Sequence, residues 1–151
     1  RCTSLPDDVF DDALAQQTSL TRLTAVPCAL TSLHSLTHLT ALVSLDVSAC
    51  TLLASLDGVA HLPIKTLEAA GCRSLTSIAA LADCTALKQL SLIDSTALTS
   101  VAPLARLTAL KHLNITGCSS LLTDVERLGA LLPDVSIYGP HEDSDDSDYA
   151  C

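Results

Sequence analysis

Apolar residues along this chain follow a pattern that repeats every 22 or 23 residues. In the block formed by residues 87–109, the pattern opens as LxxLxL, and its last two leucines have the two-residue spacing of one face of a strand. After a small residue at Ser95, apolar residues recur at every third position from Leu98 to Leu107. A period of three is typical of 3₁₀ turns or extended segments rather than of an α-helix. Each block is therefore predicted to form a short strand, a turn and a tightly wound return segment.

The same block can be traced six times along the chain, the last time in a shortened form. The successive openings lie 22, 22, 23, 23 and 22 residues apart, and they begin at Leu20, Leu42, Ile64, Leu87, Leu110 and Leu132. One such block cannot bury its own apolar face, whereas stacked blocks share a continuous core. We therefore predict an α/β repeat solenoid, in which the strands form a parallel sheet on the concave side and short 3₁₀ or irregular segments form the convex side.

The pattern also predicts where the repeats begin and end. The repeat domain is predicted to occupy residues 19–138, as about five full repeats and a shortened last one. Residues 1–18 break the pattern with a capped helix start followed by apolar residues at helical spacing, which predicts an N-terminal helical cap. Residues 139–151 carry a dense run of carboxylates and are predicted to form an acidic, disordered tail. After Leu121 the apolar spacing lengthens, which predicts an α-helical turn with Asp124 as its N-cap.

Composition narrows the possible classes of protein. The chain is 48% hydrophobic but has only one Phe, two Tyr and no Trp or Met, so its core must be aliphatic. Residues 1–12 contribute −3 to the net charge of −9, residues 139–151 contribute −5, and the rest contributes −1. The eight Lys and Arg residues form no basic stripe, so direct binding to nucleic acid is not expected. No apolar run has the roughly 18 residues of a membrane helix. A start at Arg1 in a chain without methionine predicts a fragment or a processed chain.

Four of the seven cysteines occupy one position of the repeat, eight residues after its first leucine. Together with one serine, they are Cys28, Cys50, Cys72, Ser95 and Cys118. We predict that these five side chains form a structural ladder. Zinc binding, disulfide formation and oxidation are the alternatives, but zinc needs converging ligands and disulfides need paired geometry. Small buried thiols fit a reducing compartment, so an intracellular, cytoplasmic protein is expected.

His34 and His38 are the one pair spaced as metal ligands on a helix could be. The three-residue period separates them, however, so solvated histidines on the convex side are expected. The chain has no glycine-rich phosphate loop, no GxSxG elbow and no HExxH motif. We therefore predict a non-catalytic protein without a metal or cofactor.

Function is expected on the concave face, where the variable positions between the leucines point away from the core. Lys65, Lys88 and Lys111 each follow the first leucine of their repeat and would line one sheet margin about 5 Å apart. This row is either a solvated edge compensated by nearby Asp46 and Glu68 or an anchor for an acidic partner surface. The full set of predicted partner-binding residues is Arg22, Thr24, Ser44, Asp46, Lys65, Thr66, Glu68, Lys88, Gln89, Ser91, Lys111, His112 and Asn114.

The stretch from Leu20 to Ile137 resembles the leucine-rich-repeat superfamily, whose signature is LxxLxLxx(N/C)xL with a period of about 20 to 29 residues. The form L-x-x-L-x-L-x-G-C-x-x-L-T-x-(I/V), seen with small shifts at 64–78 and 110–125, is similar to the repeats of trypanosomatid leucine-rich-repeat proteins. It is also similar to the cysteine-type repeats of F-box substrate receptors. The resemblance implies a scaffold that binds a protein partner, alone or as a subunit of a larger assembly. Alternatively, it implies a substrate-recognition or regulatory part of a multi-domain enzyme such as a ubiquitin ligase, or a surface receptor ectodomain.

Overall fold

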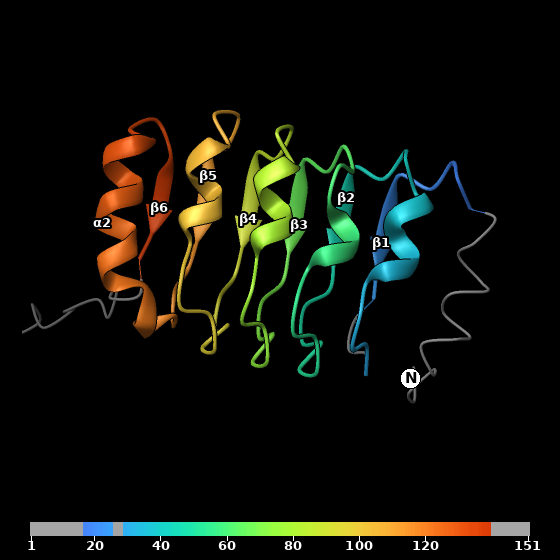
Figure 1. The fold of residues 1–151 in the computed structure, drawn as a ribbon, viewed down its shortest axis with the longest axis horizontal. Coiled ribbons are helices and arrows are strands. Elements are labelled where there is room, and N and C mark those ends of the chain that lie inside the picture. The colour runs from blue at the N-terminus through green and yellow to red at the C-terminus, as the bar shows by residue number, and fades with distance from the viewer. Residues whose placement is uncertain (1–16, 26–28, 140–151) are drawn as a thin grey trace, which may run out of the picture.

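Six short parallel strands form one open sheet in the computed structural model of the chain, which describes residues 17–25 and 29–139 (Figure 1). The strands lie in the order of the sequence, so each pairs with the strands of the neighbouring repeats. They are β1 (Arg22–Thr24), β2 (Ser44–Asp46), β3 (Thr66–Glu68), β4 (Gln89–Ser91), β5 (His112–Asn114) and β6 (Ser136–Tyr138). The predicted N-terminal cap and acidic tail fall almost entirely outside the described residues and stay predictions.

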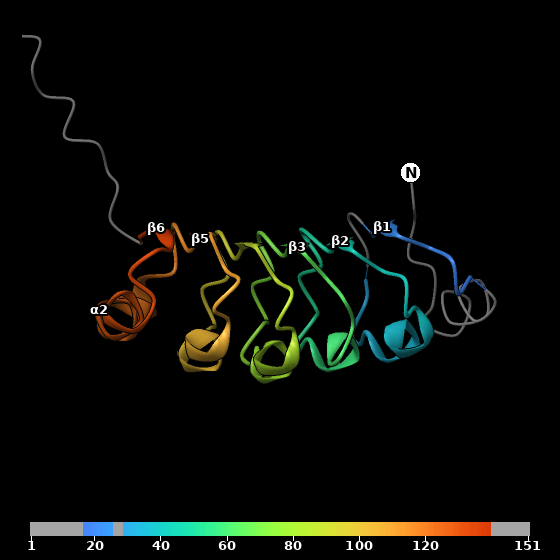
Figure 2. The ribbon, with the colours of Figure 1, turned by 90° about the horizontal axis from the view of Figure 1, so that it is seen from above.

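Tightly wound segments return the chain from the end of one strand to the start of the next. They are the 3₁₀ helices η1 (His34–His38), η2 (Asp57–Val59), η3 (Ala79–Asp83), η4 (Ala102–Arg106) and η5 (Ser119–Leu121), the last of which leads into the α-helix α2 (Leu122–Leu131). Seen from above, the strands lie along one side of the molecule and the helical segments along the other (Figure 2). The predicted solenoid, its parallel sheet and its 3₁₀ return segments are confirmed.

The core consists of aliphatic rows to which each repeat contributes the same position. The central residues of the first five strands are all leucine and are paired in register, as Leu23, Leu45, Leu67, Leu90 and Leu113. The return segments add a second row, of which Leu36, Leu81 and Leu104 are fully buried. Burying one such side chain contributes about 1.5 to 3 kcal/mol. Because each leucine packs against leucines of the adjacent repeats, the stack as a whole is stable although a single repeat is not.

The side chain eight residues after the first leucine links each repeat to the preceding one. It donates a hydrogen bond to the carbonyl oxygen at the end of the preceding LxxLxL opening. These bonds run from Cys50 Sγ to Ala25 O (3.1 Å), from Cys72 Sγ to Val47 O (3.3 Å), from Ser95 Oγ to Ala69 O (3.0 Å) and from Cys118 Sγ to Leu92 O (3.0 Å). Cys28 lies outside the described residues. Since a hydroxyl and a thiol both donate, Ser95 stands in for cysteine without loss of the bond.

The last return segment contains the predicted α-helix, but the prediction that Asp124 caps it was wrong. Helix α2 follows directly from η5, its N-cap residue is Leu121, and no side chain caps it. Asp124 lies in the first turn, where its carboxylate accepts hydrogen bonds from Ser100 Oγ and from the backbone N–H of Val101. The chain is already wound when it enters α2, so this carboxylate is available to hold the start of η4 in the preceding repeat.

A left-handed backbone residue precedes each described ladder residue. The φ angles are +60° at Ala49, +72° at Gly71, +55° at Asp94 and +79° at Gly117. This conformation costs an L-residue about 1 to 2 kcal/mol, because Cβ approaches the carbonyl oxygen, whereas glycine adopts it freely. The turn that leaves each strand therefore requires glycine or a strained residue at this position.

Substitutions at the left-handed turn are expected to change stability in opposite directions in two repeats. Gly71→Ala should lower the free energy of unfolding by about 1 kcal/mol, and Ala49→Gly should raise it by about 0.5 to 1 kcal/mol. A Cβ at residue 71 would meet only backbone atoms of Ala49 at 3.8 Å and beyond, so backbone strain is the sole penalty. Denaturant titration followed by circular dichroism measures both changes.

Gly129→Ala is the matched control, because Gly129 lies in α2 and its added Cβ would meet nothing within 4 Å. Alanine should there stabilise the protein by up to about 1 kcal/mol. Destabilisation by both glycine-to-alanine changes would contradict the role assigned to the turn.

Candidate functional site

The outer surface of the sheet, here called the concave face, carries two rows of outward-pointing side chains. The first residue of each strand forms one row, which consists of Arg22, Ser44, Thr66, Gln89, His112 and Ser136. The third residue forms the other, which consists of Thr24, Asp46, Glu68, Ser91, Asn114 and Tyr138. Parallel pairing in register holds neighbours within a row at the strand spacing of about 4.8 Å. The sheet thus displays polar groups as two regular lines.

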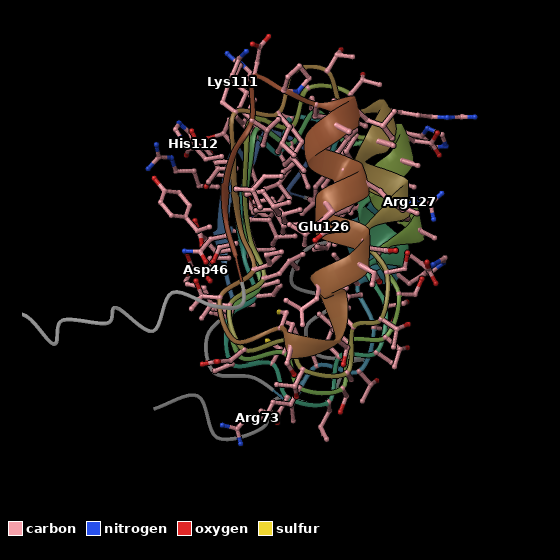
Figure 3. All side chains as sticks on the ribbon, turned by 90° about the vertical axis from the view of Figure 1, so that its left-hand side faces the viewer. Asp46, Arg73, Lys111, His112, Glu126 and Arg127 are labelled. Carbon is pink, nitrogen blue, oxygen red and sulfur yellow. The ribbon has the colours of Figure 1, made fainter. Side chains whose placement is uncertain are left out.

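The three lysines lie side by side immediately before strands β3, β4 and β5. The backbone N–H of Lys88 donates to the carbonyl oxygen of Lys65 at 2.8 Å, and that of Lys111 donates to Lys88 at 2.8 Å. All three residues are exposed. Figure 3 shows Lys111 at one margin of the sheet, close to His112, with Asp46 further along the same face. We refer to Lys65, Lys88 and Lys111 as the lysine row.

The lysine row borders an open hollow of about 430 Å³. Its lining is formed by Arg22, Val43, Ser44, Lys65, Thr66, Lys88, Gln89, Lys111 and His112. Four of these nine residues are permanent cations, and none is a carboxylate. Asp46 and Glu68, which compensate the lysines in one of the two predicted alternatives, end their strands, about 10 Å along from the residue that precedes each strand. The hollow is therefore a cationic environment on a chain with a net charge of −9.

A second hollow, of about 360 Å³, lies toward the other end of the strands. Its lining includes Glu68, Ser91, Asn114 and Tyr138. Ser91 points to this face but is only 8% exposed, because the longer side chains of Glu68 and Asn114 flank it in register. It therefore forms the floor of the hollow rather than a projecting contact, which corrects its predicted position on the exposed surface.

Sequence reasoning missed the contribution of the last, shortened repeat to the concave face. Tyr138 is 46% exposed and is the one aromatic residue that lines either hollow. Ser136 lies beside His112 in the parallel register. The Leu132-Val135-Ile137 spacing was the available signal, because it fixes residues 136 and 138 as outward positions in the same way as in the longer repeats.

Cys72 and Cys118 are free thiols held in the interior. Cys84 is another, and its Sγ donates to the carbonyl oxygen of Val59 at 3.2 Å. Burial, with a smaller effect of Cys50, raises the pKa of Cys72 from 9.0 to about 11. Burial, and then Asp83, raises the pKa of Cys84 to about 11. A thiolate is the form that binds zinc or reacts with oxidants, so these sites disfavour both.

Metal-ligating side chains do not converge within residues 17–25 and 29–139, where there is no group of three or more His, Cys, Asp or Glu residues suited to a metal ion. His34 and His38 are the first and last residues of η1, and three residues per turn place them on different sides of that helix. Among the described residues, no helix is both long and apolar enough to cross a membrane.

Comparison with known proteins identifies the fold. No protein-family model and no curated protein sequence matches the chain. Internalin C2 from Listeria monocytogenes superposes with a TM-score of 0.63 and 24% identity over 85% of this chain. Internalin F from the same organism gives 0.47 and 18% over 84%, and a leucine-rich-repeat protein from Leptospira interrogans gives 0.32 and 16% over 91%. The chain spans about half the length of these structures, at 54%, 50% and 52% respectively.

The superposition on internalin C2, together with the six repeats and the parallel sheet, shows that this chain has the leucine-rich-repeat fold. The fold that the predicted resemblance implies is confirmed. The narrower similarity to trypanosomatid proteins stays a prediction.

Alkaline pH is expected to destabilise the protein through its buried thiols. A thiol in the unfolded chain loses its proton near pH 9, whereas Cys72 and Cys84 in the folded chain lose theirs near pH 11. Their contribution is therefore complete below pH 9 and is lost progressively as the pH rises from 9 to 11. The loss is on the order of 2 kcal/mol for each thiol.

Denaturant titrations of the wild type and of the Cys72→Ser/Cys84→Ser variant across this pH range measure the effect. Serine keeps a donor in the place of each thiol, as Ser95 does, but does not titrate there. The variant should therefore lose less stability than the wild type between pH 9 and 11. Parallel losses in the two proteins would contradict the assignment to these thiols.

Proposed function

We propose that the protein is a non-catalytic scaffold that binds a protein partner through the concave face or its margins, on its own or as a subunit of a larger assembly. A role as the recognition part of a multi-domain enzyme, or as a receptor, would use the same surface. The proposal therefore concerns the surface first and the assembly second.

One observation carries this proposal: the inward positions of the strands hold almost one residue type, whereas the outward positions of the same strands hold many. The inward position is leucine in strands β1 to β5 and isoleucine in β6. The third, outward position is occupied by six different residues, namely Thr24, Asp46, Glu68, Ser91, Asn114 and Tyr138. Packing explains the uniform row, since only a leucine-sized side chain fills that layer. The outward row is free of this constraint, and its variety supports recognition of a specific, chemically uneven surface.

The state of the cysteines supports an intracellular location. Cys72, Cys84 and Cys118 are free thiols within the part of the chain that the structure describes. Proteins of reducing compartments keep such thiols, whereas small secreted domains commonly use cysteines in disulfides. We therefore place the scaffold, as a proposal, in a reducing compartment such as the cytoplasm.

Reversing the charge of the lysine row is expected to remove the bound partner. The variant Lys65→Glu/Lys88→Glu/Lys111→Glu should lose most of the proteins that the wild type enriches, because each reversal turns an attraction for an acidic surface into a repulsion. Affinity purification followed by quantitative mass spectrometry measures this loss, and we expect a decrease of about tenfold or more.

The matched control is Arg73→Glu/Arg106→Glu/Arg127→Glu, which reverses three exposed cations that do not line the hollow. Both variants lower the net charge by 6, from −9 to −15, so a general effect of charge would appear in both. Thermal unfolding should show that both are folded. Equal enrichment by the wild type and the lysine variant would exclude the lysine row from the interface.

A further inference from the structure

The lysine row places like charges beside one another without compensation from the described residues. Within residues 17–25 and 29–139 the three ammonium groups form no ion pair, and no carboxylate lines the hollow that they border. Like charges on adjacent strands are destabilising. In a chain with 17 acidic and 8 basic residues, a hollow lined by four cations and no acid is a marked segregation of charge. An anionic ligand would relieve this repulsion.

The neighbouring row of the sheet adds neutral hydrogen-bonding groups to the cations. Ser44, Thr66 and Gln89 line the same hollow and can donate to oxygen atoms of a ligand. Thr66 Oγ1 and Gln89 Oε1 lie 3.5 Å apart, so the two side chains form one polar surface. Ammonium groups beside hydroxyl and amide donors suit a ligand that carries several carboxylates.

The opposite end of the strands limits the width of such a ligand. Asp46 and Glu68 are neighbours in adjacent strands, and Glu68 lines the second hollow. A broad polyanion, such as a nucleic acid, would extend over these carboxylates and be repelled by them. A single extended peptide that crosses the strands along the margin would avoid them. From β1 to β5 this path is about 19 Å long, which is the length of roughly six extended residues.

From these observations we propose that the lysine row is a binding site for an extended acidic peptide segment of the protein partner. The segment crosses the strands along the margin, and its carboxylates pair with Lys65, Lys88 and Lys111. This inference rests on the proposed scaffold function and specifies the chemistry of the partner.

Fluorescently labelled octa-aspartate tests the proposal with the full chain, by fluorescence anisotropy. Saturable binding is expected that weakens with added salt. The variant Lys65→Gln/Lys88→Gln/Lys111→Gln should bind about tenfold more weakly or worse, as expected for the loss of three exposed pairs. The control Arg73→Gln/Arg106→Gln/Arg127→Gln, with the same net charge as the lysine variant, should bind as the wild type does. Neutral octa-asparagine should not bind.

Three results would overturn the proposal. One is the absence of binding by octa-aspartate, and another is equal weakening by the lysine and arginine variants. The third is equal or tighter binding of an oligothymidylate of the same length, which would make the row a general polyanion surface.

The five carboxylates at residues 142–148 of the chain are a possible occupant of the same site. A variant in which all five are changed to the corresponding amides tests whether the chain's own acidic residues occupy the site. If octa-aspartate binds that variant but not the unchanged chain, the site is already filled by the chain's own acidic residues, and the assignment to a partner is overturned. Equal binding to both proteins supports the assignment.

The charge-reversal and octa-aspartate experiments together distinguish failure of the acidic-peptide site from failure of the scaffold function. Loss of captured proteins in the charge-reversal experiment without octa-aspartate binding would retain the function and overturn the acidic ligand. Octa-aspartate binding with unchanged capture would support the ligand chemistry but exclude the lysine row from the interface with the captured proteins, which overturns its assignment to the partner.

Discussion

The hydrogen bond from each ladder side chain to the preceding repeat is the interaction on which the rest of the structure depends. It gives the buried donor of one repeat a partner at the point where the chain of the preceding repeat turns away from the sheet, and a buried donor without a partner would be costly. It also fixes the distance between repeats, because donor and acceptor belong to neighbours in the stack. The backbone pairing of the strands and the packing of the leucine rows act at the same distance between repeats. Contacts between repeats in the interior therefore determine where the side chains of the concave face lie.

Much of the fold follows from the sequence because each repeat imposes the same local rules. The LxxLxL spacing specifies a strand with one buried face, and the three-residue period of residues such as Leu98 and Leu104 specifies a 3₁₀ return. The rules fail where a residue acts across repeats. Asp124 has the position of a helix cap in the sequence, but its carboxylate bonds to the preceding repeat. A pattern within one repeat contains no information about that partner.

The sequence predicts which face of the sheet carries the candidate site, but not how deeply each side chain lies within that face. Alternation within a strand placed Thr66 and His112 on the surface that the hollow occupies, and the position after the first leucine placed the lysines at its margin. It could not reveal that Ser91 lies at the bottom of a hollow, because its exposure depends on the size of its neighbours in two other repeats. Nor did proximity in sequence mean compensation of charge. Lys65 and Glu68 are three residues apart, but an extended backbone separates them along the strand and leaves each margin of the sheet with its own charge.

The uniform register of the sheet relates the length of a bound segment to the number of repeats. Each repeat adds one strand, and each strand advances the concave face by the same step of about 4.8 Å. The number of cations in line is therefore set by the number of consecutive repeats with lysine after the first leucine, which is three in this chain. Duplicating residues 87–109 would add one more cation at the same spacing without altering any existing contact, because each repeat touches only its neighbours. In this architecture the length of the recognised segment is counted in repeats, so selectivity for length can change by duplication while selectivity for chemistry stays fixed.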